Sequence, residues 1–199
     1  MPAMTPRTAT ISRITRETDI TLRLDLDGTG ATNIATGIGF LDHMLTALAF
    51  HARFDLDLSC AGDLAIDDHH TAEDCGIVLG DALAQALGDR AGIARFASAY
   101  APLDEALART VIDISGRPFA RVELGLVRDM IGTLAAENVT HVLMSFAAAA
   151  RLTLHVDVLA GTNDHHKAEA AFKATALALR AAVTRSNETA VPSTKGTLG

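Results

Sequence analysis

One histidine motif occurs twice in this chain, and it limits the possible folds more than any other feature of the sequence. A pair of histidines stands four and three residues before a glutamate in the segments DHHTAE and DHHKAE, which begin at Asp68 and Asp164. A single histidine precedes the first pair by 26 residues and the second by 24. The motif predicts two similar halves with the same donors: His43, His69, His70 and Glu73 in the first half, and His141, His165, His166 and Glu169 in the second.

Helix geometry predicts how these donors are arranged. Residues three and four apart lie on one face of a helix, so each glutamate is expected beside both histidines of its own pair. Adjacent helical residues point about 100° apart, so the two histidines of one pair are not expected to bind the same ion. We therefore expect two metal sites, each with one histidine from each pair and the glutamate of one copy. Which histidine binds which ion stays open.

The donor types limit the choice of metal. All the donors are imidazoles or carboxylates, which argues against a closed zinc site of the finger type, where thiolates are common. The set fits Mn, Fe, Co, Ni or Zn. The two cysteines, Cys60 and Cys75, lie in no paired cysteine motif and are expected to pack as small apolar groups.

Composition excludes several other classes of protein. Of the 199 residues 49% are hydrophobic, enough for a substantial core, yet no stretch approaches the ~20 apolar residues of a membrane span. The N-terminal segment has no apolar signal-peptide core, so we expect the protein in the cytoplasm. The net charge is −7, with one Tyr, no Trp and no basic tract, so we expect no nucleic-acid partner.

The duplication extends to the expected secondary structure. Alternating apolar residues predict strands at 20–26 and 54–58, and helical periodicity predicts helices at 40–51 and 69–87. An extended run is also expected after the turn residues Asp27 to Gly30.

The second half repeats this order. Strands are expected at 108–115, 119–126 and 152–158, and helices at 137–150 and 164–183. In each half the lone histidine lies on the first helix and the histidine pair opens the second. The acidic residues just before or at the start of the second helix are candidate N-caps: Asp67, Asp68 and Asp164.

These elements predict an α+β fold. Each half reads as strands, helix, strand, helix, and we expect the halves to be related by a pseudo-twofold axis, with helices packed on one face of the β-sheets. The repeats cover about 7–90 and 95–185, with a loop at 88–92 between them. We expect residues 1–199 to form a single domain.

Several longer motifs resemble the imidazoleglycerol-phosphate dehydratase family. They occur in family order over essentially the whole chain: GFLDHML (39–45), DDHHTAED (67–74), RFxxxxAPLDEAL (95–107), SGRP (115–118), AGxNxHHxxEAxFKA (160–174) and PSxKGxL (192–198). The resemblance implies dehydration of D-erythro-imidazoleglycerol phosphate to imidazole acetol phosphate, a step of histidine biosynthesis. It further implies two Mn²⁺ ions per active site and a homo-oligomer of 24 subunits with active sites at subunit interfaces.

The resemblance also assigns roles to residues. The eight donors of the repeated motif would bind metal, and His43, His69, His70 and Glu73 would also contact the substrate. Glu17 matches a substrate-contacting glutamate and is the first choice for the general base, although by itself it reads as a solvated residue. Glu73 and Glu169 are further candidates for moving protons. His51 falls in a substrate-contacting segment and is interpreted as a substrate or supporting group, not a ligand.

A phosphate ester needs cations for its recognition. Arginine offers planar, multidentate donors and lysine a point charge. The positions that match the family's phosphate contacts are Arg95, Arg117, Lys173, Ser193 and Lys195. Around Lys195, the small residues Ser193, Thr194 and Gly196 favour an anion-binding loop.

The chemistry explains why such a reaction needs metal. Bound as imidazolate between two ions, the substrate ring can expel the neighbouring hydroxyl. A carboxylate then takes the proton from the adjacent carbon.

Two other classes use the same donors. A dinuclear metallohydrolase would activate water for attack on an ester or amide and would not require an imidazole in its substrate. A metal-storage oligomer would bind ions without turnover, but the phosphate-binding candidates argue against storage.

Overall fold

The computed structural model describes residues 6–186 and 190–198, and it divides into two halves with the same order of elements. The first half contains, in chain order, β1 (Thr8–Ile14), β2 (Thr18–Asp25), β3 (Thr32–Ala35), α1 (Gly39–Ala52), β4 (Asp55–Gly62) and α2 (His69–Leu87). The second contains β5 (Phe96–Leu103), β6 (Ala106–Asp113), β7 (Phe119–Glu123), a short hairpin of β8 (Met130–Ile131) and β9 (Leu134–Ala135), α3 (Ala136–Ala149), β10 (Thr153–Ala160) and α4 (Asp164–Ala182).

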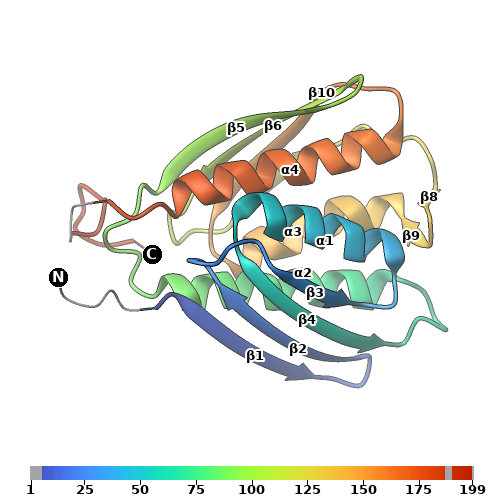
Figure 1. The fold of residues 1–199 in the computed structure, drawn as a ribbon, viewed down its shortest axis with the longest axis horizontal. Helices are drawn as coiled ribbons and strands as arrows, with labels where there is room; N and C mark the ends of the chain where they lie inside the picture. Colours follow the sequence, from blue (N-terminus) through green and yellow to red (C-terminus); the bar gives the residue numbers. More distant parts are fainter. Residues whose placement is uncertain (1–5, 187–189, 199) are drawn as a thin grey trace.

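The two large sheets have equivalent topologies. Their strand orders are β1-β2-β4-β3 and β5-β6-β10-β7, and in both the last pair is parallel while the others are antiparallel. The sheets form the two outer layers, and the four helices lie between them (Figure 1). The α+β class and the helices on one face of each sheet are therefore confirmed, and the matching topologies bear out the duplication.

The core forms where the helices meet the inner faces of the sheets. In β2, the side chains of Ile20, Leu22 and Leu24 are buried while their neighbours face outward, which is the period-2 pattern of a strand covered on one face. The helices also pack across the halves, α1 on α4 and α2 on α3, and a single hydrophobic cluster extends through both halves.

Besides the short β8 and β9, two strands of the large sheets were not predicted from the sequence, and both lie at sheet edges. β1 and β5 are each paired on one side only, and few of their side chains reach the core. In β1 only Ala9 is buried, and Ile14 is 72% exposed. An edge strand with small or exposed residues carries little of the hydrophobic alternation that identifies a strand in sequence.

The candidate caps also differ from expectation. Asn163, not Asp164, caps α4, since its side chain accepts from the backbone N–H groups of His165 and His166. Asp68 occupies the cap position of α2 without a side-chain capping bond, while Asp67 accepts from His69 N at 2.9 Å. The side chains of Asp68 and Asp164 bond to a different segment of the chain.

Two glycines explain how closely α2 and α3 approach. A Cβ at Gly76 would lie 2.7 Å from the carbonyl oxygen of Val142, and one at Gly80 would lie 2.5 Å from that of Phe146. Glycine inside a helix costs about 1 kcal/mol relative to alanine, so here the close packing of backbones justifies its presence. The α2–α3 contact sets the distance between the first turns of the two helices.

We predict that Gly80→Ala destabilises the protein by about 1–2 kcal/mol, because overpacking against backbone outweighs the gain in helix propensity. Chemical denaturation of the metal-free protein measures the change. Gly39→Ala is the matched control, since a Cβ there meets nothing within 4 Å, and it should change stability by less than about 0.5 kcal/mol. Equal effects of the two substitutions would show that the α2–α3 approach is not tight.

Candidate metal centre

The four helices begin at the same end of the molecule, on the right in Figure 1, so the histidines in their first two turns gather there. His43 comes from α1 and His141 from α3, while the histidine pairs open α2 and α4. Because α1 packs on α4 and α2 on α3, each lone histidine meets the pair of the opposite half. Two separate groups of donors result.

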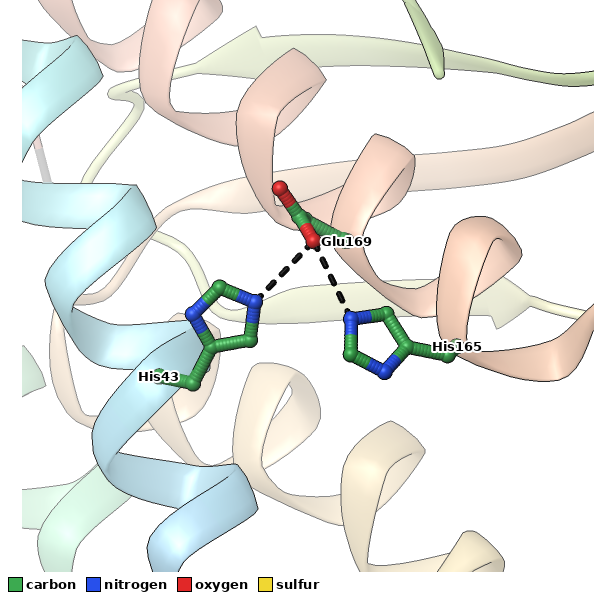
Figure 2. Close-up of side chains that lie close together, drawn as sticks. All are labelled: His43, His165 and Glu169. Carbon is green, nitrogen blue, oxygen red and sulfur yellow. Dashed lines mark hydrogen bonds and ion pairs between the residues drawn. The ribbon is translucent and has the colours of Figure 1, made fainter. Parts of the chain in front are cut away.

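The first group consists of His43, His165 and Glu169, and Figure 2 shows both imidazoles pointing at one carboxylate oxygen. The Nε2 atoms of His43 and His165 lie 3.0 and 3.2 Å from Oε2 of Glu169. The other carboxylate oxygen lies 2.5 Å from Nζ of Lys173. Burial would raise the pKa of Glu169, but Lys173 and His43 outweigh it and lower the pKa to about 2. Glu169 is therefore ionised, as a metal ligand must be.

The second group consists of His69, Glu73 and His141. The two imidazoles stack with centroids 5.0 Å apart, and Nε2 of His141 lies 3.2 Å from Oε1 of Glu73. His69 contacts Asn138 Oδ1 through Nδ1 at 3.1 Å, which leaves its Nε2 toward Glu73 at 3.7 Å. Although His141 Nε2 is buried, it makes no hydrogen bond of acceptable geometry with the described residues.

Both groups fit a divalent cation. The three donor atoms of each group lie within 4.8 Å of one another, and two imidazole nitrogens with one carboxylate oxygen match borderline metal ions. Ligands about 2.0–2.2 Å from a central ion are separated by such distances. The buried and unbonded Nε2 of His141 indicates donors that face a common point rather than one another. Three protein ligands leave further coordination positions for a substrate or another ligand.

The remaining histidine of each pair points away from its own group. His70 contacts Oδ2 of Asp63 through Nδ1 at 3.0 Å, and His166 contacts Oε2 of Glu105 through Nδ1 at 2.7 Å. These carboxylates raise the pKa of both histidines, and His166 and backbone N–H groups hold the pKa of Glu105 well below its usual range. A carboxylate at Nδ1 leaves Nε2 as the nitrogen available to a metal ion, which is the usual arrangement of a metal-binding histidine.

The expectation that each glutamate lies beside both histidines of its pair was therefore only half right. Glu73 lies beside His69 and Glu169 beside His165, each four residues away, while the other histidine of each pair turns aside. Glu17, in the turn between β1 and β2, is 52% exposed and lies 3.7 Å from Nε2 of His70. Within one chain it is thus next to neither group of three donors.

The phosphate-binding candidates lie mostly at the opposite end of α4. Arg95 donates to Asp113 at 2.7 Å and to the carbonyl of Pro192 at 2.7 Å, so it touches the segment that precedes Ser193. Backbone N of Arg95 bonds to the carbonyl of Ala182 at the end of α4, whereas His165 is at its start. Seventeen residues of helix separate these points by about 26 Å.

The other candidates differ in their surroundings. Ser193 to Gly196 form a tight turn in which Lys195 N bonds to Ser193 Oγ at 3.2 Å, and Thr194 is exposed within it. Arg117 is exposed in the β6–β7 turn, and no described residue forms an ion pair with it. Lys173 lies at the first donor group. Burial and then the charge of Lys173 lower the pKa of His51.

Sequence reasoning missed the residues that orient the imidazoles. Asp63, Glu105 and Asn138 each bond to a ring nitrogen, but they lie outside the His-His-Glu motif. Glu105 belongs to the APLDEAL motif, which carried the family resemblance without indicating this role. No helix in the described part of the chain is long and apolar enough to cross a membrane.

The fold and the paired His–Glu groups define a class of α+β protein with two candidate metal sites built from a duplicated motif. The chain belongs to the imidazoleglycerol-phosphate dehydratase family, whose sequence model matches residues 36–179. It is 62% identical over 192 residues to an imidazoleglycerol-phosphate dehydratase of Phytophthora nicotianae, covering 96% of this chain but only 42% of that protein. It is 54% identical over 208 residues to one of Candida glabrata, covering 96% of this chain and 99% of the relative.

Solved structures agree with this placement. Imidazoleglycerol-phosphate dehydratase from Staphylococcus aureus superposes with a TM-score of 0.82 at 37% identity, over 90% of this chain and 99% of that one. The Pyrococcus furiosus protein, in complex with (S)-C348, also gives a TM-score of 0.82, at 38% identity over 94% and 100% of the two chains. The fold described above is therefore the fold of this family.

Proposed function

We propose that this protein dehydrates D-erythro-imidazoleglycerol phosphate to imidazole acetol phosphate, a step of histidine biosynthesis. The observation that carries the proposal is the pair of His–Glu groups, built from the motifs that the chain shares with its family. A hydro-lyase that acts on this substrate needs metal ligands to hold the ions that bind the imidazole ring, cationic side chains to bind the phosphate, and a base to remove a carbon-bound proton. The chain has candidates for all three.

The proposed cofactor is Mn²⁺, two ions per active site. His43, His165 and Glu169 would hold one ion, and His69, Glu73 and His141 the other. Bound there, the ions would supply the Lewis acidity that an imidazolate form of the substrate ring would need. The anionic Glu169 neutralises part of the cation's charge, and the ring contacts of Asn138, Asp63 and Glu105 fix the imidazoles that face the substrate.

We propose further that one chain does not complete an active site. His43, His69 and His165 are 43–45% exposed, so the donor groups lie open at the surface. Arg95 touches the segment that precedes Ser193 and bonds to the end of α4, and about 26 Å of helix separates that end from His165, too far for a small substrate to bridge. A second copy would bring its phosphate-binding turn and its outward-facing His70 and His166 to these groups.

The larger assembly follows from the same argument. Closed symmetric assemblies let every copy give and receive the same contact, and a homo-oligomer of 24 copies is the proposed form. The whole chain is proposed to form one domain of this family. The cytoplasm stays the predicted location.

Glu17 is the proposed general base. Its carboxylate lies 3.7 Å from Nε2 of His70, so a copy that lends His70 to a metal ion would bring Glu17 to the same substrate. Its half-exposed position leaves it free to accept a proton from carbon. Lys173 would stay with Glu169, and Arg95, Arg117 and Lys195 would bind the phosphate.

We predict that removal of metal by a chelator abolishes turnover of imidazoleglycerol phosphate and that added Mn²⁺ restores it. Formation of imidazole acetol phosphate is followed directly. His43→Ala should lower kcat at least about 100-fold, because one ligand of an ion is lost. A folded, metal-loaded and assembled protein that does not turn over this substrate but hydrolyses phosphate or carboxylic esters would support the metallohydrolase instead.

Glu17→Gln should lower kcat by about 10²–10⁴-fold, as expected when a general base is removed. The Mn²⁺ content should not change, and KM should change little, since the amide keeps the size of the side chain. Glu123→Gln is the control, because Glu123 is exposed on β7 and pairs only with Arg121 among the described residues. Normal turnover by Glu17→Gln would assign the base to another residue.

Mixing inactive variants tests whether sites are shared between copies. His165→Ala and Lys195→Ala should each be inactive, and their co-assembly should recover activity in about a quarter of the sites, because sites that draw on two copies then include intact combinations. His165→Ala mixed with His43→Ala should recover none, since both residues belong to one group of one chain. If the mixture of His165→Ala and Lys195→Ala recovers no activity, the whole site lies within one copy.

A further inference from the structure

One segment connects the two donor groups and plays no part in the reaction proposed above. It comprises residues 125–135, between β7 and α3, and is here called the bridging segment. It includes the small β8–β9 hairpin, in which Met130 pairs with Ala135 and Ile131 with Leu134. Its two ends are held by the first turns of α4 and α2, the helices that carry the histidine pairs.

A buried ion pair holds the first end. Oδ2 of Asp164 accepts from the backbone N–H groups of Val127 at 2.8 Å and Arg128 at 2.7 Å. Its Oδ1 lies 3.0 Å from Nζ of Lys167, which also donates to the carbonyl of Gly125 at 2.7 Å. Asp164 is 2% exposed and Lys167 is 7% exposed. Among the described residues, the partners of both charges are therefore each other and the backbone of this segment, immediately beside His165.

The equivalent aspartate of the first half holds the other end. Oδ2 of Asp68 accepts from the backbone N–H of Ala135 at 2.7 Å, beside His69. The N–H of Ala136 then bonds to the carbonyl of Asp129 at 2.8 Å, which closes the hairpin just before α3 begins. Asp68 and Asp164 occupy the same place before the two histidine pairs, and neither caps its helix through its side chain.

The tip of the segment reaches the first donor group as well. A Cβ at Gly132 would lie 3.6 Å from Cβ of Phe40. The ring of Phe40 packs edge-on against His165, with centroids 5.1 Å apart, and against His43, with centroids 6.2 Å apart. The segment thus touches the supports of His165, His43 and His69, and it leads directly into the helix that carries His141.

We propose that Asp68, Asp164 and Lys167 are positioning residues that use the bridging segment to hold the two donor groups in their metal-binding geometry. The proposal rests on the metal binding proposed above. A metal site needs its ligands fixed within a fraction of an ångström, and the residues that fix them set the affinity. Here the first turns of α2 and α4 are tied to one segment, so displacement of either end changes the spacing of donors at both.

Asp164→Asn is the most direct test. The amide must turn its NH₂ either toward the ammonium of Lys167 or toward the two backbone N–H groups, so at least one attachment is lost. We expect the folded variant to bind Mn²⁺ at least about tenfold more weakly, as is common when a partner behind a metal ligand is removed. Mn²⁺ binding to chelator-stripped protein is measured by electron paramagnetic resonance of the free ion, with circular dichroism as the check on folding.

Asp157→Asn is the matched control. Asp157 is a carboxylate on β10 that accepts from Arg109 at 2.8 Å and Arg121 at 2.6 Å, and it contacts neither the bridging segment nor the donors. The Mn²⁺ affinity of the Asp157→Asn variant should equal that of the wild type. Asp68→Ala provides a second variant that leaves no buried cation without a partner, and it too should weaken Mn²⁺ binding.

The outcomes separate this inference from the proposed function. Wild-type affinity in folded Asp164→Asn or folded Asp68→Ala, even with lower thermal stability, would reduce the segment to a purely structural element and overturn the inference. Failure of the wild type to bind Mn²⁺ would overturn the proposed function together with it. Weaker binding in both variants and unchanged binding in Asp157→Asn would establish the positioning role.

Discussion

Packing between the helices of the two halves is the interaction on which the site depends. α1 packs on α4 and α2 on α3, and through these contacts each lone histidine reaches the glutamate of the opposite half. His43 and Glu169 are 126 residues apart in sequence yet 3.0 Å apart in space. The close approach of α2 and α3 needs glycine at positions 76 and 80, where a side chain would meet backbone atoms. Apolar packing between the layers thus sets the geometry of a polar site.

The polar residues around the imidazoles form a second level of organisation. Asn138, Asp63 and Glu105 contact Nδ1 of His69, His70 and His166, so these three rings are oriented by neighbours outside the repeated motif. Four histidines belong to donor groups of their own chain, His43, His69, His141 and His165, whereas His70 and His166 belong to neither group. One chain therefore presents two groups of three donors together with two histidines that these groups do not use, which is the arrangement that the proposed sharing of sites between identical copies requires.

Duplication gives the two halves the same parts but does not make them identical. Glu169 is paired with Lys173 and has a pKa of about 2, whereas no lysine contacts Glu73 among the described residues. Asp68 and Asp164 hold opposite ends of one segment that has no counterpart in the first half. The two donor groups thus differ in charge and in support, although the sequence motif that builds them is nearly the same.

The sequence by itself determined the donor types, their helical positions, the α+β order of elements and the family. These features depend on local periodicity and on motifs, which a single chain displays directly; α2, for example, spans the residues expected for it. Tertiary structure decided the rest: which histidine turns toward each glutamate, which carboxylates orient the rings, and how β1 and β5 close the sheets. The ring orientations depend on contacts between residues far apart in the chain, and the edge strands have little hydrophobic pattern. Both are therefore determined by the packing of helices against sheets and not by local sequence.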